Sequence, residues 1–214
     1  MSERPPGTEA VPTGNYFDKY GSRNPITVRL MRGFFQHLDR HLKRAGQVEA
    51  VLDIGCGEGQ VATFVRERLP GARYCALDID RGLVAETARR NPGAHCLVSE
   101  ACSLPWHDHS FDLVLGIEVL EHLRQPEAAL AEAARVSRRH VLVSVPNEPL
   151  WRVLNVFRGA YLSRLGNTPG HIQHWGAAGF RRLLESRLEV IELSRPLPWL
   201  MALCRTTGPQ QPSA

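Results

Sequence analysis

Short apolar blocks and longer amphipathic blocks alternate along most of this chain. The short blocks are typical of buried strands and occur at about 50–54, 73–78, 95–99, 111–116 and 140–145. The longer blocks have the spacing of helices that bury one face and occur at about 59–69, 82–90 and 126–136. Repeated strand–helix pairs of this kind predict an α/β fold, in which helices cover both faces of a mostly parallel sheet.

An amphipathic segment also precedes the first strand. Asn24 followed by Pro25 is a favourable helix start, and Gly46 is a favourable stop, so we expect a helix at 25–45. Apolar residues recur in it at every fourth position: Ile26, Leu30, Phe34, Leu38 and Leu42. After the fifth strand the pattern predicts a helix at 177–186, a strand at 188–193 and a short apolar run at 200–204.

The connection at 146–175 is long for a compact domain, which indicates a functional segment or one with structure of its own. Its apolar residues have helical spacing and are interleaved with Arg152 and Arg158: Leu150, Val153, Leu154, Phe157 and Tyr161. The favoured interpretation is a helix whose apolar face closes a pocket. The alternative is a helix that lies on a membrane surface and serves a lipid-linked substrate.

Composition narrows the class of protein. A chain of 214 residues with 43% hydrophobic and 22% charged residues suits one globular domain. A net charge of +4, evenly spread, does not favour a nucleic-acid partner. Five cysteines without a C-x-x-C pair indicate reduced thiols and a cytoplasmic location.

The two ends differ from the rest in composition. Residues 1–14 are rich in Pro, Gly, Thr and Glu and have no apolar run. They predict a disordered tail, neither a signal peptide nor a membrane span. The same expectation holds for 206–214, which leaves one folded domain at 15–205.

The most informative segment has the pattern D-x-G-x-G-x-G, formed by Asp53, Gly55, Gly57 and Gly59 between a predicted strand and a predicted helix. Glycine has no Cβ, so such a turn takes positive φ and brings backbone N–H groups against a carboxylate or phosphate. A dinucleotide-binding turn, G-x-G-x-x-G, needs glycine at position 60, which is Gln60. A nicotinamide dehydrogenase is therefore the weakest alternative.

This segment resembles the first motif of the class I S-adenosylmethionine (SAM)-dependent methyltransferases, in the small-molecule branch around methyltransferase type 11. Four more segments follow in the order of that family: Ala76-Leu77-Asp78-Ile79, Ser99-Glu100-Ala101, Ser110 to Val114 running into Glu118 to His122, and Val143 to Asn147. The resemblance covers about 45–195. It implies a Rossmann-like fold with an N-terminal cap helix, an insertion after the fifth strand, and an antiparallel seventh strand at 200–204.

The resemblance also implies a cofactor site for SAM. Asp53 would receive its ammonium, directly or through water, Asp78 would accept both ribose hydroxyls, and Ile79 would pack on the adenine. The amides of the turn, Gly55, Cys56, Gly57 and Gly59, would contact the methionine moiety. Glu100 would accept the adenine amino group, with the backbone of Ala101 and Cys102 beside it. Glu118 is a further implied cofactor contact. For Asp78 the structural alternative is a cap of the following helix. Tyr16, Tyr20 and Arg23 would fold over SAM or the substrate, with ordinary packing as their alternative.

Candidates for a general base are less specific than the cofactor residues. Glu118 follows the fourth strand at its carboxyl end, where open α/β sheets bind ligands. His171 and His174 lie in a distinctive Gly-Pro-rich stretch, and base, substrate contact and structural hydrogen bonding all remain open for them. No third ligand is evident beside them, so no metal site is predicted. Further carboxyl and imidazole candidates are Glu121, His122 and Glu148, with the pair 121–122 favoured as a structural feature.

These observations predict an enzyme that transfers a methyl group from SAM to a small molecule. A hydroxyl of a natural product, sugar or lipid-linked precursor is the favoured acceptor. Gly116-Ile117-Glu118-Val119 stands where nucleic-acid amine methyltransferases carry an Asn/Asp-Pro-Pro-Tyr/Phe signature, which argues against base methylation. The alternatives are a non-catalytic SAM-binding or partner-activating subunit, and an N- or C-methyltransferase. We expect a monomer or a homodimer.

Overall fold

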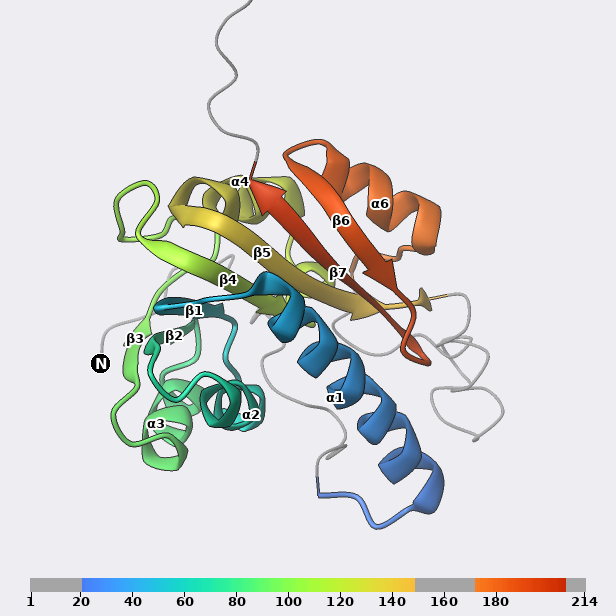
Figure 1. Cartoon of the computed structure of the whole chain (residues 1–214), viewed down its shortest axis with the longest axis horizontal. Coiled ribbons are helices and arrows are strands. Elements are labelled where there is room, and N and C mark those ends of the chain that lie inside the picture. The colour runs from blue at the N-terminus through green and yellow to red at the C-terminus, as the bar shows by residue number, and fades with distance from the viewer. Residues whose placement is uncertain (1–20, 149–171, 207–214) are drawn as a thin grey trace, which may run out of the picture.

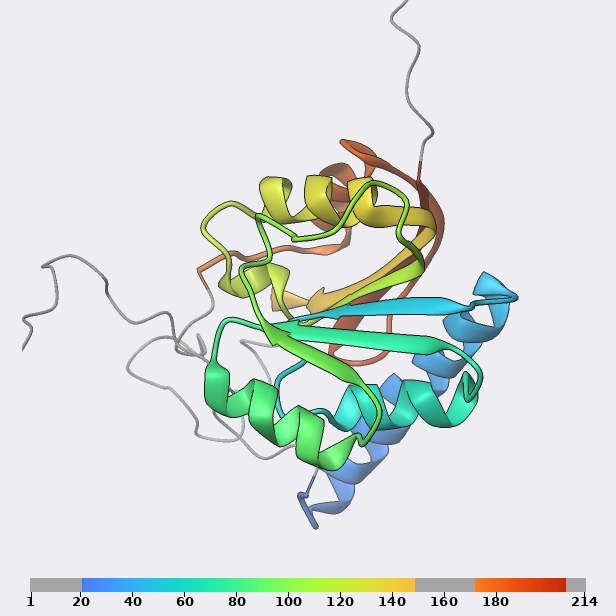
Figure 2. The same cartoon turned by 90° about the vertical axis from the view of Figure 1, so that its left-hand side faces the viewer.

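The computed structural model describes residues 21–148 and 172–206. A seven-stranded sheet lies between two layers of helices (Figures 1 and 2). The strands are β1 (Ala50–Ile54), β2 (Arg73–Asp78), β3 (His95–Val98), β4 (Phe111–Ile117), β5 (Ser137–Pro146), β6 (Leu188–Ser194) and β7 (Trp199–Thr206). The helices are α1 (Pro25–Ala45), α2 (Gln60–Arg68), α3 (Arg81–Arg90), the 3-10 turn η1 (Leu120–His122), α4 (Pro126–Val136) and α6 (Ala177–Glu185).

The strand order is β3-β2-β1-β4-β5-β7-β6. Strands β1 to β5 pair in parallel, and β7 runs antiparallel between β5 and β6. The order reverses between β1 and β4, and open α/β sheets bind ligands outside the carboxyl ends of the strands at such a point. The predicted α/β fold with a mostly parallel sheet and an antiparallel last strand is confirmed.

Each face of the sheet carries its own apolar core. On one face, Leu52 and Ile54 of β1 pack with Leu130 of α4 and Phe180 of α6. On the other face, Val51 lies in a cluster that is centred on α1 and α2. Because neighbouring strand residues point to opposite faces, Asp53 points into the second core although its neighbours Leu52 and Ile54 point into the first.

Helix α1 forms where the sequence predicts it. The Asn24 side chain accepts hydrogen bonds from the amides of Ile26 at 2.9 Å and Thr27 at 3.4 Å. Its buried face begins at Met31 and continues to Ala45, so most of the helix covers the sheet. Its N-terminal end extends past the carboxyl ends of β4 and β5 (Figure 1), and Ile26 there is 72% exposed.

Two strands are longer than their apolar runs. Strand β5 begins at Ser137, three polar positions before the predicted start, because a β-bulge between Phe111 and Leu113 lets it pair with β4 earlier. Arg138 then reaches the Asp112 carboxylate at 2.9 Å. Strand β7 gains Trp199 at one end and Arg205 and Thr206 at the other through its pairing with β5 and β6.

Two classes of feature are missing from the described part of the chain. Among its helices, none combines the length and hydrophobicity of a membrane span. Its His, Cys, Asp and Glu side chains form no group of three that could hold a metal ion.

Candidate functional site

The glycine turn joins the end of β1 to α2 at the point where the strand order reverses. Gly55, Gly57 and Gly59 have φ values of 70°, 54° and 82°, in the left-handed region that favours glycine. A Cβ on Gly55 would collide with the Val119 side chain, and one on Gly59 would lie 3.0 Å from the Thr87 backbone. A Cβ on Gly57 would meet nothing within 4 Å. Two glycines are therefore needed for packing, and the middle one faces open space.

Helix α3 holds this turn in place. The Thr87 hydroxyl donates to the Gly57 carbonyl at 2.8 Å, and the Asn91 amide, just past the helix, donates to the Gly59 carbonyl at 3.0 Å. Arg90 donates to the Glu58 carbonyl at 2.9 Å. Sequence reasoning missed these residues, and their only signal was their common position at the end of the helix that follows β2. The turn is thus fixed before any ligand arrives.

Several amides of the turn are engaged within the protein. Cys56 donates to the Leu77 carbonyl at 2.9 Å, Gly57 to the Asp78 carboxylate at 3.0 Å, and Gly59 to the Cys56 carbonyl at 3.1 Å. Within residues 21–148 and 172–206, the amides of Gly55 and Glu58 have no such protein acceptor. The predicted contact with the cofactor's carboxylate therefore falls first to these two amides.

Asp53 lies beneath the turn and is 1% exposed. Its carboxylate accepts a hydrogen bond from the Tyr74 hydroxyl at 3.0 Å. Burial raises the pKa of the Asp53 carboxyl to about 7; the Tyr74 hydrogen bond opposes the rise and the nearby Asp78 carboxylate adds to it. A cation beside Asp53 would favour its ionised form. Sequence reasoning missed Tyr74 as well.

Asp78 ends β2 beside the turn. Its two oxygens accept hydrogen bonds from the amides of Gly57 and Asp80, both at 3.0 Å. The cap of α3 is Asp80, which accepts from the amides of Gly82 and Leu83, so the helix-cap alternative for Asp78 is wrong. Each carboxylate oxygen can accept more than one hydrogen bond, so Asp78 retains acceptor capacity for two ribose hydroxyls.

The predicted adenine contacts lie next to Asp78. Ile79 is 48% exposed, which is unusual for a large apolar residue directly after a buried strand. The Ser99 amide donates to the Asp78 carbonyl at 3.1 Å and so brings the end of β3 alongside. Glu100 is exposed there, and Ala101 and Cys102 are half-buried. The structure thus gathers the predicted adenine residues at one edge of the sheet.

Glu118 directly follows β4 and adopts a left-handed φ of 57°. Its amide donates to the Ser144 carbonyl of β5 at 3.0 Å, and its carboxylate accepts a hydrogen bond from the Trp199 indole. The next side chain, Val119, packs on Gly55. Glu118 therefore lies at the carboxyl end of β4 next to a residue that contacts the glycine turn, and the sequence did not reveal its partner Trp199.

The remaining candidate residues from the sequence differ in exposure and in their place in the fold. Arg23 is exposed just before α1, and Tyr16, Tyr20 and His171 lie outside the described residues. His174 is exposed, in a segment that returns alongside η1. Glu121 and Glu148 are buried, and His122 lies in η1. Amides of Ile172 and Gln173 donate to the Glu121 carbonyl at 3.0 and 3.1 Å and bring that segment near the end of β4.

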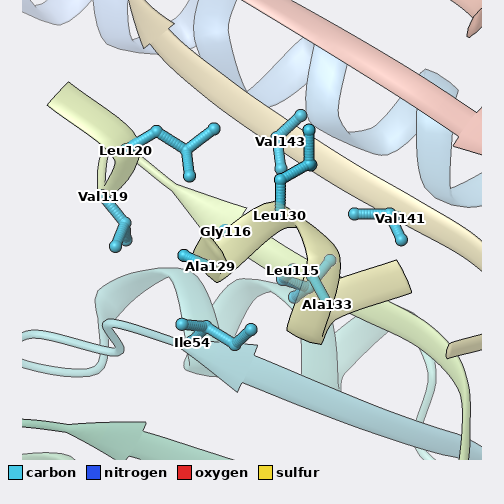
Figure 3. Close-up of a pocket in the computed structure, with 10 residues that line it drawn as sticks. All are labelled: Ile54, Leu115, Gly116, Val119, Leu120, Ala129, Leu130, Ala133, Val141 and Val143. Atoms are coloured by element: carbon cyan, nitrogen blue, oxygen red, sulfur yellow. The ribbon is translucent and has the colours of Figure 1, made fainter. Parts of the chain in front are cut away.

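A small cavity between the sheet and α4 is not a ligand site. Figure 3 shows that hydrocarbon groups line it: Ile54, Leu115, Gly116, Val119, Leu120, Ala129, Leu130, Ala133, Val141 and Val143. A charged cofactor needs polar partners, and these side chains offer none. The cavity belongs to the core beneath the turn.

Comparison with known proteins agrees with this geometry. Residues 52–144 match the family model described as a methyltransferase domain. The chain is 33% identical over 108 residues to phthiotriol/phenolphthiotriol dimycocerosates methyltransferase 1 of Mycobacterium ulcerans, covering 48% of this chain and 40% of that protein. It is 34% identical over 99 residues to the malonyl-acyl-carrier-protein O-methyltransferase of Hahella chejuensis, covering 45% and 36%. The chain thus spans less than half the length of the curated relatives it matches.

A solved structure gives the same result for the fold. Magnesium protoporphyrin IX methyltransferase from Synechocystis PCC 6803, with bound S-adenosylhomocysteine (SAH), superposes with a TM-score of 0.64 at 18% sequence identity. The match covers 87% of this chain and 90% of that one. Residues 52–144 thus match a methyltransferase domain, on the fold of a SAM-dependent methyltransferase, and the cofactor of such a domain is SAM.

Proposed function

We propose that this protein transfers a methyl group from SAM to a hydroxyl oxygen of a small-molecule acceptor, a natural product, sugar or lipid-linked precursor. The observation that carries the proposal is the position of Glu118 at the carboxyl end of β4, where its carboxylate accepts from Trp199 and the next residue, Val119, packs on Gly55 of the glycine turn. One edge of the sheet thus presents cofactor-binding groups and a carboxylate that can receive a proton.

The residues present fit SAM. The opening over Gly57 admits a ligand against the backbone, and Asp78 offers a carboxylate to a diol. The exposed Ile79 offers an apolar surface to an aromatic ring. Asp53 offers a buried carboxylate to an ammonium group. When bound, SAM supplies a methyl group on a sulfonium, which is transferred by in-line displacement.

The chain's own contribution to the rate is orientation and proton removal. Positioning two reactants correctly is worth as much as about 7–11 kcal/mol. A hydroxyl acceptor must also lose a proton, and a well-placed base adds about 10²–10⁴-fold. Glu118, directly after β4, is the residue that we propose as the base. His171 and His174 are further proposals, as a base or as contacts to the acceptor.

Two further considerations favour a small hydroxylated acceptor in the cytoplasm. The Hahella relative is named as an O-methyltransferase, and the Mycobacterium relative is named as a methyltransferase of phthiotriol and phenolphthiotriol dimycocerosates. All five cysteines are unpaired thiols, which suits a reducing compartment. A small molecule is the only partner that we propose, with the protein as a monomer or homodimer.

Calorimetric titration with SAM, SAH and NAD is the first test. We expect micromolar binding of SAM and SAH and none of NAD. Transfer of radiolabelled methyl from SAM would then be measured against hydroxylated natural products, glycosides and long-chain diols, with Asp78→Ala as the variant that loses cofactor binding. Cofactor binding without transfer to any acceptor would favour the non-catalytic alternative, and labelled product at nitrogen or carbon would refute O-methylation.

A further inference from the structure

Two residues that are far apart in the chain meet at the carboxyl ends of β4 and β5. Trp199 begins β7, and its indole N–H donates to the Glu118 carboxylate across a sequence separation of 81 residues. Trp199 is 3% exposed, and its ring packs edge-on against Phe34 of α1 with centroids 5.1 Å apart. The indole is therefore held from two sides, by β7 and by α1.

Strand β5 fixes the backbone of both partners. The Glu118 amide donates to the Ser144 carbonyl at 3.0 Å, and Trp199 pairs with Pro146 two residues further along the same strand. The Asn147 amide donates to the Pro198 carbonyl at 3.0 Å. Because the backbone of Glu118 is hydrogen-bonded to β5 and Trp199 pairs with the same strand, this one strand sets the distance between the carboxylate and the indole.

The conformation of Glu118 indicates that this arrangement is functional. A non-glycine residue with φ of 57° is strained by about 1–2 kcal/mol, and such residues cluster at functional sites. A buried indole N–H needs only one acceptor, and a backbone carbonyl would satisfy it. Here the acceptor is a charged side chain at the ligand-binding edge of the sheet.

We propose that Trp199 is a positioning residue for methyl transfer, which holds the Glu118 carboxylate ionised and oriented toward the acceptor beside the glycine turn. This inference rests on the proposed function of Glu118 as the group that receives the acceptor's proton. A hydrogen bond to the charged form of an acid stabilises that form, so the indole keeps Glu118 able to accept a proton at lower pH.

The kinetic test is a double-mutant cycle with Trp199→Phe and Glu118→Gln. Trp199→Phe keeps a ring against Phe34 and removes the N–H. We expect kcat to fall at least about tenfold, as part of the base contribution is lost, and the acid limb of its pH profile to move up by about one unit. SAH affinity should stay within about twofold. Adding Trp199→Phe to Glu118→Gln should cost little more, because both changes remove one interaction.

Trp106→Phe is the matched control. Trp106 also packs edge-on against a phenylalanine, Phe111, but it lies away from the glycine turn on the other face of the sheet. This change should leave the pH profile where it is. Additive losses in the cycle, or an unmoved acid limb in Trp199→Phe, would show that Trp199 only packs and would overturn the inference.

A second measurement does not depend on turnover. The indole N–H resonance of Trp199, assigned by its loss in Trp199→Phe, should shift with pH as Glu118 titrates, and Glu118→Gln should abolish that pH dependence. A resonance that is indifferent to pH and to Glu118→Gln overturns the inference even if the enzyme is active. Absence of methyl transfer by the wild-type protein, with the resonance behaving as expected, instead refutes the proposed function and the catalytic part of the inference, leaving only the contact.

Discussion

Cofactor binding should release a proton from Asp53. The carboxyl is 1% exposed, and burial raises its pKa to about 7, so near neutral pH a large fraction of the unliganded protein carries it protonated. An ammonium group beside it favours the ionised form. The bound ammonium lowers the pKa of the Asp53 carboxyl below about 7. Between that lowered pKa and about 7, each unit of falling pH should therefore weaken binding of SAH about tenfold, or about 1.4 kcal/mol.

The ligand limits the same effect from the other side. Once the ligand's α-amino group loses its proton, it no longer offers a cation to Asp53. Affinity should therefore be greatest in the range between about 7 and the pKa of that amino group, and fall on both sides. The Tyr74 hydroxyl, 3.0 Å from Asp53, lowers the pKa of that carboxyl, so Tyr74→Phe should move the lower edge of the range upward.

Isothermal titration with SAH from pH 5.5 to 8.5 measures this directly. Repeating the titration near pH 6.5 in buffers of different ionisation enthalpy counts the protons released. Asp53→Asn is the control, and its affinity should be flat on the acidic side. An affinity of the wild-type protein that is constant between pH 5.5 and 7, or an Asp53→Asn variant with the same pH dependence, would refute the assignment of Asp53 to the ammonium.

Three more predictions concern the turn, α1 and the ribose contact. Gly59→Ala should lower the free energy of urea unfolding by about 1–3 kcal/mol, because the new Cβ would lie 3.0 Å from the Thr87 backbone at φ of 82°; Gly57→Ala has space and should cost less, and equal losses would contradict this. Burial of His41 lowers its pKa to about 4, so it adds stability that is complete above about pH 6.5 and is lost as pH falls to about 4. That loss is about 3 kcal/mol, and His41→Gln should flatten the stability profile there in chemical denaturation. Asp78→Ala should weaken SAH binding about a hundredfold by calorimetry, since two hydrogen bonds to a charged group are lost; unchanged affinity would exclude the ribose contact.

The sequence predicted the sheet and the glycine turn because both are encoded locally. Buried parallel strands form continuous apolar runs, and the turn needs glycine at fixed positions. Asp78, Ile79 and Glu118 could be placed because Asp78 ends a strand and the other two directly follow one, and parallel strands bring their carboxyl ends to one edge.

The partners of these residues could not be predicted in the same way. Tyr74 meets Asp53 because β2 lies next to β1, and Trp199 meets Glu118 only because β7 inserts beside β5. Neither contact has a periodic pattern or a motif, and each depends on the order of strands in the folded sheet. The same reason hides Thr87 and Asn91, whose role is visible only once α3 lies against the turn.

The place of β7 in the sheet has a consequence for synthesis in the cell. Residues 199–206 leave the ribosome after every other described strand, yet they fill an interior position between β5 and β6. Until then the nascent chain must keep the β5 edge unpaired, although Leu142, Val143 and Val145 line it with hydrophobic groups. An unpaired apolar edge is a template for aggregation. The final step of folding therefore waits for the end of translation of this segment, and we expect chaperones to bind the nascent chain during that interval.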